Sequence, residues 1–362
     1  MKTHLIYIGR NFSYDRAFQD YSRDEIEERL GQISSMNFFN ESDNSLFLFL
    51  EKILLERVNI VILTTKSTFS IIGKLLCTIT SDNQVLKDGI LLPSHTSLYE
   101  KDSYLLNYKD AVLNIIQTAT AHKLPTILIK NVNRSATIHI FEEDIVSSKI
   151  LLEPLSQTYD TILYYTTIID GWIQVNIDGT KYGNINQFIA SAKQLLPSKI
   201  VGASNIVAYI NERLLQNNYK ISFAESCTGG LLASKFTAIS GVSSVFNGSL
   251  ITYSNELKSN WLAVSEENIE KFGVVSGEIV DEMSDGVMNV SDSHYAISIS
   301  GIAGPDGGSE YKPVGTVYVS VRGKKQHTNQ LLELHGNRTY IQEQSTLHAI
   351  KMLLLFDKET FF

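Results

Sequence analysis

The chain has 362 residues, of which 43% are hydrophobic and 19% are charged, and its formal net charge at pH 7 is −8. This composition excludes a largely disordered protein, and the negative charge argues against binding of nucleic acid, which normally needs clustered Lys and Arg. The only two cysteines, Cys77 and Cys227, exclude a disulfide framework and a cysteine-based zinc site. Because a single core rarely exceeds about 250–300 residues, we expect two or three domains.

The start of the chain predicts a first β-strand and no signal peptide. It lacks both a long apolar segment and a small-residue cleavage site. No stretch in the sequence approaches the roughly 18 uninterrupted apolar residues that suggest a membrane span. We therefore expect no membrane partner and a cytoplasmic location.

The first 150 residues alternate between strand-like and helix-like patterns. Leu5–Ile8, Asn59–Leu63 and Pro125–Ile129 are predicted as strands. The apolar positions between Leu46 and Leu54 form one helical face, and residues 110–121 are predicted to be helical. Strands that alternate with helices favour a mainly parallel α/β sheet.

A different pattern follows between residues 155 and 200. Thr161–Tyr165 and Trp172–Ile177 are predicted as strands, residues 185–196 as a helix, and Pro197 as a break. This segment fits a small α+β module or a simple connector.

The last third of the chain again predicts an α/β domain, and its glycine content suggests where the chemistry lies. Of the 22 glycines, 14 lie between Gly229 and Gly336, where tight turns and close backbone approaches need them. The predicted elements are a helix from Ile206 to Leu215, a strand from Lys220 to Ala224, a helix over Ile279–Val287 with Ser276 as its N-cap, strands around Ile297–Ile299 and Val317–Val321, and a helix over Thr339–Leu355.

Four polar segments in this last third suggest one catalytic site. The first three each follow a strand, and such junctions converge on one crevice in an open α/β sheet. The glycine-rich loop of the third segment lacks the Lys-Ser/Thr ending of a P-loop, so we do not interpret it as an ATP site. The segments are Ala224–Gly230, Thr252–Lys258, Ser300–Gly308 with Lys312–Thr316, and His335–Arg338.

Amide hydrolysis would need a nucleophile, a base and an oxyanion site, and these segments contain candidates for each. Ser226 is the candidate nucleophile, although it could instead cap the following helix, and Cys227 is its rival. Lys258 is the candidate base because a buried lysine can accept a proton near neutral pH, whereas an isolated lysine more often lies on the surface. Backbone N–H groups around Thr228, Gly229 and Gly230, or around Ser300 and Gly301, could bind the oxyanion.

From about residue 203 to 356, these motifs closely resemble the C-terminal domain of the competence/damage-inducible protein A (CinA) family, the nicotinamide mononucleotide deamidases. The resemblance implies conversion of nicotinamide mononucleotide to nicotinate mononucleotide and ammonia through Ser226 and Lys258, without cofactor or metal, in a homodimer. It implies that Arg338 anchors the phosphate, unless Arg338 forms only a salt bridge at the helix start. The other implied substrate-binding residues are Glu225, Thr228, Gly229, Gly230, Tyr253, Asn255, Ser300 and Gly301.

The chain departs from the family pattern at one position of the C-terminal domain. Family members usually carry a second basic residue four positions after the arginine, and this chain has Gln342 there. The resemblance also implies the domain organisation: a three-layer molybdopterin-binding-like domain at 1–153, a small α+β KH-like connector at 154–202, and a three-layer α/β/α CinA domain at 203–362.

The first domain departs further from its family counterpart, which is associated with metal-dependent ADP-ribose pyrophosphatase activity. Gly9–Ser13 and Thr64–Ser70 replace a Gly-Thr-Glu motif and a glycine-rich loop. We expect this domain to have lost that activity and to serve architecture or oligomerisation. The alternatives are a bifunctional enzyme that still cleaves ADP-ribose, and a non-catalytic nucleotide-binding scaffold.

Overall fold

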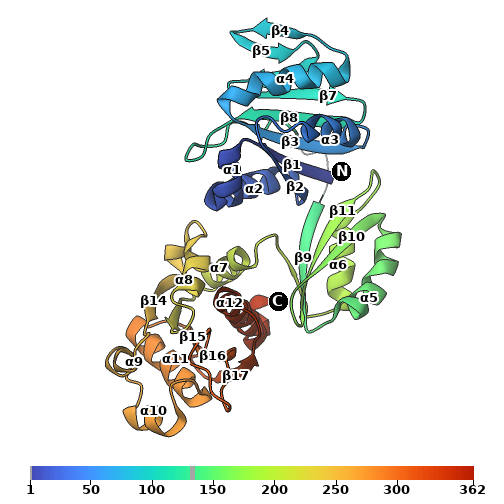
Figure 1. The fold of residues 1–362 in the computed structure, drawn as a ribbon. Helices are drawn as coiled ribbons and strands as arrows, with labels where there is room; N and C mark the ends of the chain where they lie inside the picture. Colours follow the sequence, from blue (N-terminus) through green and yellow to red (C-terminus); the bar gives the residue numbers. More distant parts are fainter. Residues whose placement is uncertain (1, 131–134) are drawn as a thin grey trace. The chain divides into compact units, whose positions relative to one another are not determined.

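The computed structural model describes residues 2–130 and 135–362 and divides the chain into two compact units, Met1–Arg134 and Ser135–Phe362 (Figure 1). The first unit is an α/β domain, and the second contains two separate sheets, of which both contribute side chains to its largest core. In the part of the chain that is described, no helix has both the length and the apolar character needed to cross a bilayer.

The first unit is built on a six-stranded mixed sheet with the order β2-β1-β3-β8-β7-β6. The first four strands of this order pair in parallel, and β7 and β6 add antiparallel pairs. A separate β4–β5 hairpin lies beside α4. The strands are β1 (Lys2–Ile8), β2 (Ile33–Phe39), β3 (Val58–Thr64), β4 (Gln84–Lys87), β5 (Ile90–Pro93), β6 (Thr96–Glu100), β7 (Ser103–Tyr108) and β8 (Ala111–Gln117).

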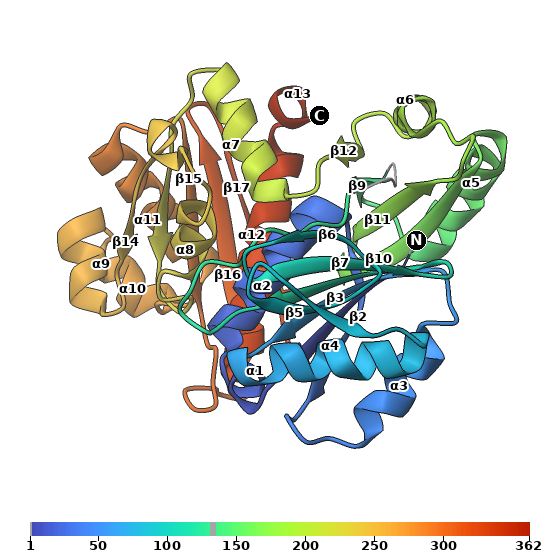
Figure 2. The same cartoon turned by 90° about the horizontal axis from the view of Figure 1, so that it is seen from above.

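Helices cover both faces of this sheet and give three layers, as Figures 1 and 2 show. The reason lies in the strands, since every residue of β3 is buried and both of its faces need an apolar cover. One core contains side chains of α3 (Ser45–Ile53) and α4 (Lys66–Thr80), and the other contains those of α1 (Arg10–Tyr14) and α2 (Arg16–Leu30).

Two predictions in this unit were wrong. Residues 110–121 contain the strand β8 and no helix, because their apolar run is buried in the sheet and lacks a helical period. The predicted strand at Pro125–Ile129 has no regular secondary structure. Its apolar side chains are buried nonetheless, and the Leu128 N–H donates at 2.5 Å to the side-chain Oδ1 of Asn114 in β8 and not to a backbone carbonyl.

The second unit begins with an antiparallel four-stranded sheet of order β10-β11-β9-β12. The predicted strands at 161–165 and 172–177 and the helix at 185–196 are confirmed. The boundary predicted at 153/154 falls inside this module, because β9 pairs with β11 and α5 packs in the same core. The elements are β9 (Ser135–Phe141), α5 (Ile145–Thr158), β10 (Thr161–Ile169), β11 (Trp172–Gly179), α6 (Ile185–Leu195) and β12 (Ile200–Gly202).

The last part of the chain forms a five-stranded sheet of order β14-β13-β15-β16-β17. Strands β14, β13 and β15 are parallel, and β16 and β17 are antiparallel. The strands are β13 (Ile221–Glu225), β14 (Phe246–Ile251), β15 (Tyr295–Gly301), β16 (Thr316–Gly323) and β17 (His327–Glu333), and the helices are α7 (Ile206–Gln216), α8 (Leu231–Thr237), η1 (Val242–Ser244), α9 (Asn255–Leu262), α10 (Glu266–Phe272), α11 (Gly277–Ser291), α12 (Arg338–Phe356) and α13 (Lys358–Phe361).

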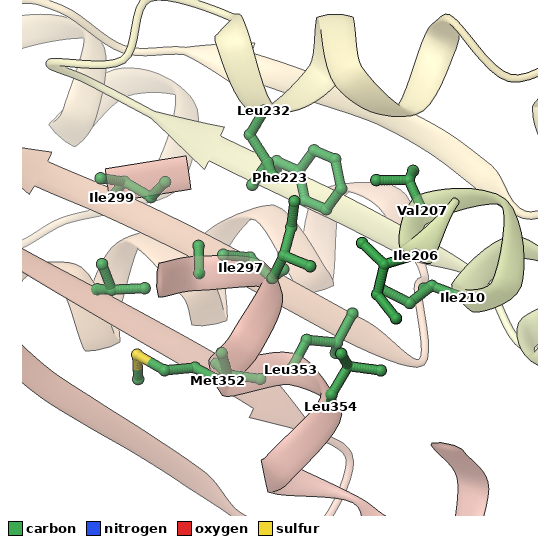
Figure 3. Packing of buried hydrophobic residues seen from close by; sticks show 14 of the residues in the cluster. Ile206, Val207, Ile210, Phe223, Leu232, Ile297, Ile299, Met352, Leu353 and Leu354 are labelled. Carbon is green, nitrogen blue, oxygen red and sulfur yellow. The ribbon is translucent and has the colours of Figure 1, made fainter. Parts of the chain in front are cut away.

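Alternating side chains of β13 build a core on each side of this sheet. Phe223 packs with α7, α8 and α12, whereas Ala224 packs with α9 and α11. Figure 3 shows side chains of α7 and α12 turned toward Phe223 and toward Ile297 of β15. The predicted helices at α7, α11 and α12 and the Ser276 N-cap are confirmed, and the domain has the expected three layers.

Candidate active site

The candidate site lies at the carboxyl edge of the five-stranded sheet. The register pairs Glu225 of β13 with Ile251 of β14 and with Ile299 of β15. The residue after each of these three carries a hydroxyl group, so Ser226, Thr252 and Ser300 lie at one level at the ends of three neighbouring strands. Parallel pairing thereby brings together three motifs that are far apart in the sequence.

Ser226 and Lys258 are in contact, as the sequence predicted. Lys258 Nζ lies 3.2 Å from Ser226 Oγ and donates to the Thr252 carbonyl oxygen at 2.8 Å. Helix α9 fixes this geometry, because the Ser254 side chain caps its first turn and Lys258 lies one turn further on. Lys258 is only 2% exposed.

Burial favours the neutral form of this lysine. Desolvation disfavours the ammonium form and lowers the pKa of Lys258 from its ordinary value. In the described part of the chain, no carboxylate forms an ion pair with Lys258 that would restore the charged form. A lysine in this position is suited to accept a proton from a neighbouring hydroxyl group.

The neighbouring Glu225 carboxylate is fully buried and forms an internal cap for α8. It accepts hydrogen bonds from Thr228 Oγ1 at 2.8 Å and from the N–H groups of Gly230, Leu232 and Ala233 at 2.9–3.1 Å. Ser249 Oγ is a fifth donor at 3.2 Å. The Gly230 N–H was one candidate for binding the oxyanion, but it already donates to this carboxylate.

The turn between β13 and α8 leaves two N–H groups near the nucleophile. Gly229 and Gly230 adopt φ values of 61° and 97°, which favour glycine. The Ser226 N–H donates to the Ile299 carbonyl at 3.0 Å. Among the described residues, neither the Cys227 N–H nor the Thr228 N–H donates to the backbone carbonyl of another residue, which leaves them as candidate oxyanion donors.

Cys227 has the character of a packed apolar residue. Its thiol is 4% exposed within the core that contains Phe223, and burial raises its pKa to about 12. A thiol with such a pKa contains almost no thiolate at neutral pH and is a poor nucleophile. The structure therefore favours Ser226 over Cys227.

The carbonyl oxygen of Cys227 has a partner that the sequence did not predict. Gln342 of α12 donates through Nε2 to this oxygen at 2.7 Å. Gln342 is the residue at which the chain departs from the family pattern. A side chain from the C-terminal helix α12 therefore holds the turn that carries Ser226.

Ser300 and Gly301 help to hold the walls of the site. Ser300 Oγ donates to the Val274 carbonyl at 2.8 Å, and Lys312 Nζ donates to the carbonyls of Phe272 and Val275 at 2.9 and 2.7 Å. Ser300 and Lys312 thereby hold the loop between α10 and α11. A Cβ atom at Gly301 would lie 2.8 Å from the Thr316 carbonyl oxygen, so only glycine fits beside β16.

Arg338 lies at the start of α12 and contacts two other loops of the site. It donates to the Gly304 carbonyl at 2.9 Å and to the Tyr253 hydroxyl at 2.7 Å. No ion pair links Arg338 to a carboxylate of the residues that the structure describes, so the salt-bridge alternative is not what is observed. Tyr253 is 58% exposed, and Asn255 is exposed at the first position of α9.

Comparison with known proteins gives matches to part of the chain. Residues 203–356 match the family model described as the CinA C-terminal domain. A CinA-like protein of Fervidobacterium nodosum is 52% identical over 144 residues, which cover 40% of this chain and 35% of that protein. A CinA-like protein of Endomicrobium trichonymphae is 39% identical over 198 residues, covering 53% of this chain and 46% of the relative.

A solved structure matches a similar share of the chain. The crystal structure of competence/damage inducible protein CihA from Agrobacterium tumefaciens is 32% identical, with a TM-score of 0.40. The match covers 41% of this chain and 94% of that protein. This chain thus covers almost the full length of the CihA structure. It covers only about a third to a half of the length of the two curated relatives.

Proposed function

Because the chain belongs to the CinA family through residues 203–356, we propose that this domain hydrolyses the carboxamide of nicotinamide mononucleotide to nicotinate mononucleotide and ammonia. The observation that carries this proposal is the contact between Ser226 Oγ and the buried Nζ of Lys258. A hydroxyl group in contact with an amine that can accept its proton is the arrangement that amide hydrolysis through an acyl-enzyme needs.

The proposed reaction begins with attack of Ser226 Oγ on the carboxamide carbon. Lys258 Nζ accepts the hydroxyl proton and then delivers it to the departing nitrogen, so that ammonia leaves. Water hydrolyses the resulting ester and releases the acid. The lowered pKa of Lys258 supports this proton transfer, because a larger fraction of the amine is free to accept a proton near neutral pH.

The remaining residues suggest how the substrate would be held. The N–H groups of Cys227 and Thr228 would stabilise the oxyanion, while the Glu225 cap and the two glycines keep the turn in shape. Arg338 would bind the phosphate, because its planar guanidinium can donate two parallel hydrogen bonds. Tyr253 and Asn255 would border the pyridine ring, and we expect the enzyme to act as a homodimer.

Ammonia release from nicotinamide mononucleotide tests the proposal. We expect Ser226→Ala and Lys258→Met each to lower kcat by at least about a thousandfold, because each removes one partner of the reacting pair. Arg338→Ala should mainly raise KM, since its proposed contact is present before and during the reaction.

Two matched variants serve as controls. Cys227→Ala changes the neighbouring rival nucleophile, and Lys235→Met changes a lysine that pairs with Glu343 outside the site. Both should keep at least about half of the wild-type rate. If Ser226→Ala kept a near-normal turnover, the assignment of the nucleophile would be wrong, and a wild-type protein without ammonia release would contradict the proposed function.

A further inference from the structure

Thr252 is placed inside the candidate site by the sheet. Its backbone N–H donates to the Glu225 carbonyl at 2.9 Å, and its own carbonyl accepts from Lys258 Nζ. Leu250 packs in the core on the α9 and α11 side of the sheet. Since side chains alternate along a strand, Thr252 is directed to that same side, where α9 carries Lys258.

The Thr252 hydroxyl group is buried without a hydrogen-bond partner. Thr252 is 0% exposed. Within residues 203–362, all of which are described, the only other residue with a buried side-chain polar atom that lacks a hydrogen-bond partner is Asn211. A buried hydroxyl group without a partner costs stability, so a valine of the same shape would be the more stable choice. A threonine at this position therefore points to a functional use of the hydroxyl group.

We propose that Thr252 is a further active-site residue, whose hydroxyl group orients the water that hydrolyses the acyl-enzyme; this inference rests on the proposed function. The three neighbouring hydroxyl groups would then have separate tasks. Ser226 forms the ester, and Ser300 donates to Val274 and holds the loop. Of the three, Thr252 is the one whose hydroxyl group has no hydrogen-bond partner.

Thr252 would assist the hydrolysis of the ester on Ser226. The water oxygen forms a bond to the acyl carbon, and one water proton passes to Lys258 Nζ. The bond between the acyl carbon and Ser226 Oγ then breaks, and Lys258 returns the proton to Ser226 Oγ. Nicotinate mononucleotide leaves as the acid and loses its proton to solvent.

Thr252→Val tests the inference, with Thr252→Ser as the conservative variant that keeps the hydroxyl group. For Thr252→Val we expect a burst of about one ammonia per active site, followed by turnover at least about tenfold slower than wild type. Mass spectrometry should then find the acyl group on the peptide that contains Ser226. Hydroxylamine, a nucleophile that does not depend on the position of water, should restore turnover by forming the hydroxamate.

Stability provides the control for a merely structural role. Thr252→Val should unfold at the same temperature as wild type or a higher one, because the lost hydroxyl group has no partner. Thr252→Ser should turn over within about twofold of wild type. A lower unfolding temperature of Thr252→Val, or a slow Thr252→Val without an acyl adduct, would overturn the inference.

The two proposals fail in distinguishable ways. A wild-type protein that releases no ammonia overturns the proposed function itself. Wild-type turnover together with an equally fast Thr252→Val overturns only the role of Thr252. Accumulation of the acyl-enzyme in Thr252→Val, with rescue by hydroxylamine, supports both.

Discussion

The charge of Lys258 decides whether Ser226 can be activated. Burial lowers the pKa of Lys258, so the neutral base becomes available at a lower pH than for an exposed lysine. We predict that kcat/KM for nicotinamide mononucleotide rises with pH and levels off below the ordinary lysine pKa of about 10.4. A pH–rate profile measures this, and a rate that falls across the same range would contradict a role of Lys258 as base.

The same pKa shift links stability to pH. Between the lowered pKa of folded Lys258 and its ordinary value, the unfolded chain binds more protons than the folded chain. The free energy of unfolding therefore rises with pH in this window, and the penalty for burying the ammonium is present in full below it. Lys258→Met should lack this rise, which urea unfolding at a series of pH values would detect.

Gln342 is predicted to keep the oxyanion donors in place. Its hydrogen bond to the Cys227 carbonyl fixes the plane of the peptide whose other end is the Thr228 N–H. Gln342→Leu should lower kcat about tenfold with little change in KM, a smaller loss than removal of an oxyanion donor itself. Gln342→Lys keeps a donor and should retain more activity than Gln342→Leu.

The matched control for this prediction is Gln344→Leu. Gln344 lies two positions further along α12, on another side of the helix, so its substitution should leave kcat unchanged. Steady-state kinetics on the three variants distinguish a positioning role from general damage to α12. Equal losses in Gln342→Leu and Gln344→Leu would contradict the prediction.

The sequence could predict the contact between Ser226 and Lys258, because each follows a predicted strand or turn of one sheet edge. It could not predict which hydroxyl and amide groups are already engaged. Ser300 is bonded to Val274, and Gln342 reaches Cys227 across 115 positions of the chain. Such partners depend on side-chain directions that tertiary packing sets, and Thr252 was therefore not among the predicted site residues.

Helix α8 depends on an internal anion. Its seven residues are too few for a stable isolated helix, and the Glu225 carboxylate satisfies N–H groups that no intrahelical partner can reach. Glu225→Gln removes the charge and should lower the free energy of unfolding by about 2–3 kcal/mol. The loss should also reduce activity, because the same carboxylate holds the turn after Ser226.

Tryptophan fluorescence during urea unfolding can measure this effect. Both tryptophans of the chain, Trp172 and Trp261, lie in the unit Ser135–Phe362 and so report on its unfolding. Glu343→Gln is the control, because its pair with Lys235 is partly exposed and contributes about 0–1 kcal/mol. Equal stabilities of the two variants would show that the cap contributes little.

Helices and strands were predictable to the extent that their apolar residues follow one period. The spacing in α7 and α11 indicated helices correctly, because each buries one face. Strand β8 is buried along most of its length, and its apolar residues, interrupted only by Asn114, show no period that separates a strand from a helix. The packed segment around Leu128 illustrates the opposite error, since burial there comes without strand pairing.

The division of the whole chain was harder to predict than its elements. Strand β9 follows the first unit directly in sequence but pairs with β11 and β12, which lie further along the chain. A sequence pattern can identify β9 as a strand, but it does not show which strands β9 pairs with. The pairing determines the domain to which β9 belongs. The predicted boundary therefore fell about twenty residues after the observed division at Arg134.

The first unit is predicted to lack ADP-ribose pyrophosphatase activity. A glycine-rich loop would offer unhindered N–H groups to a diphosphate, but here the turn after β3 carries Thr65 and Lys66. Thr65 Oγ1 and Thr68 Oγ1 lie 3.0 Å apart, and the Thr65 N–H donates to Thr68 Oγ1. The Thr65 methyl group is also packed against Gly9, at 2.7 Å from the position that a Cβ atom there would take.

Because these groups bond and pack with one another, the turn has little capacity left for a diphosphate. We expect the full-length Ser226→Ala variant, incubated with ADP-ribose and Mg²⁺ or Mn²⁺, to release no AMP above the rate without protein. Chromatographic detection of AMP makes the measurement, and the Ser226→Ala background keeps the second unit from contributing. Metal-dependent AMP release that a Thr65→Trp substitution abolishes would instead establish a bifunctional enzyme, since the bulky side chain would close the turn after β3.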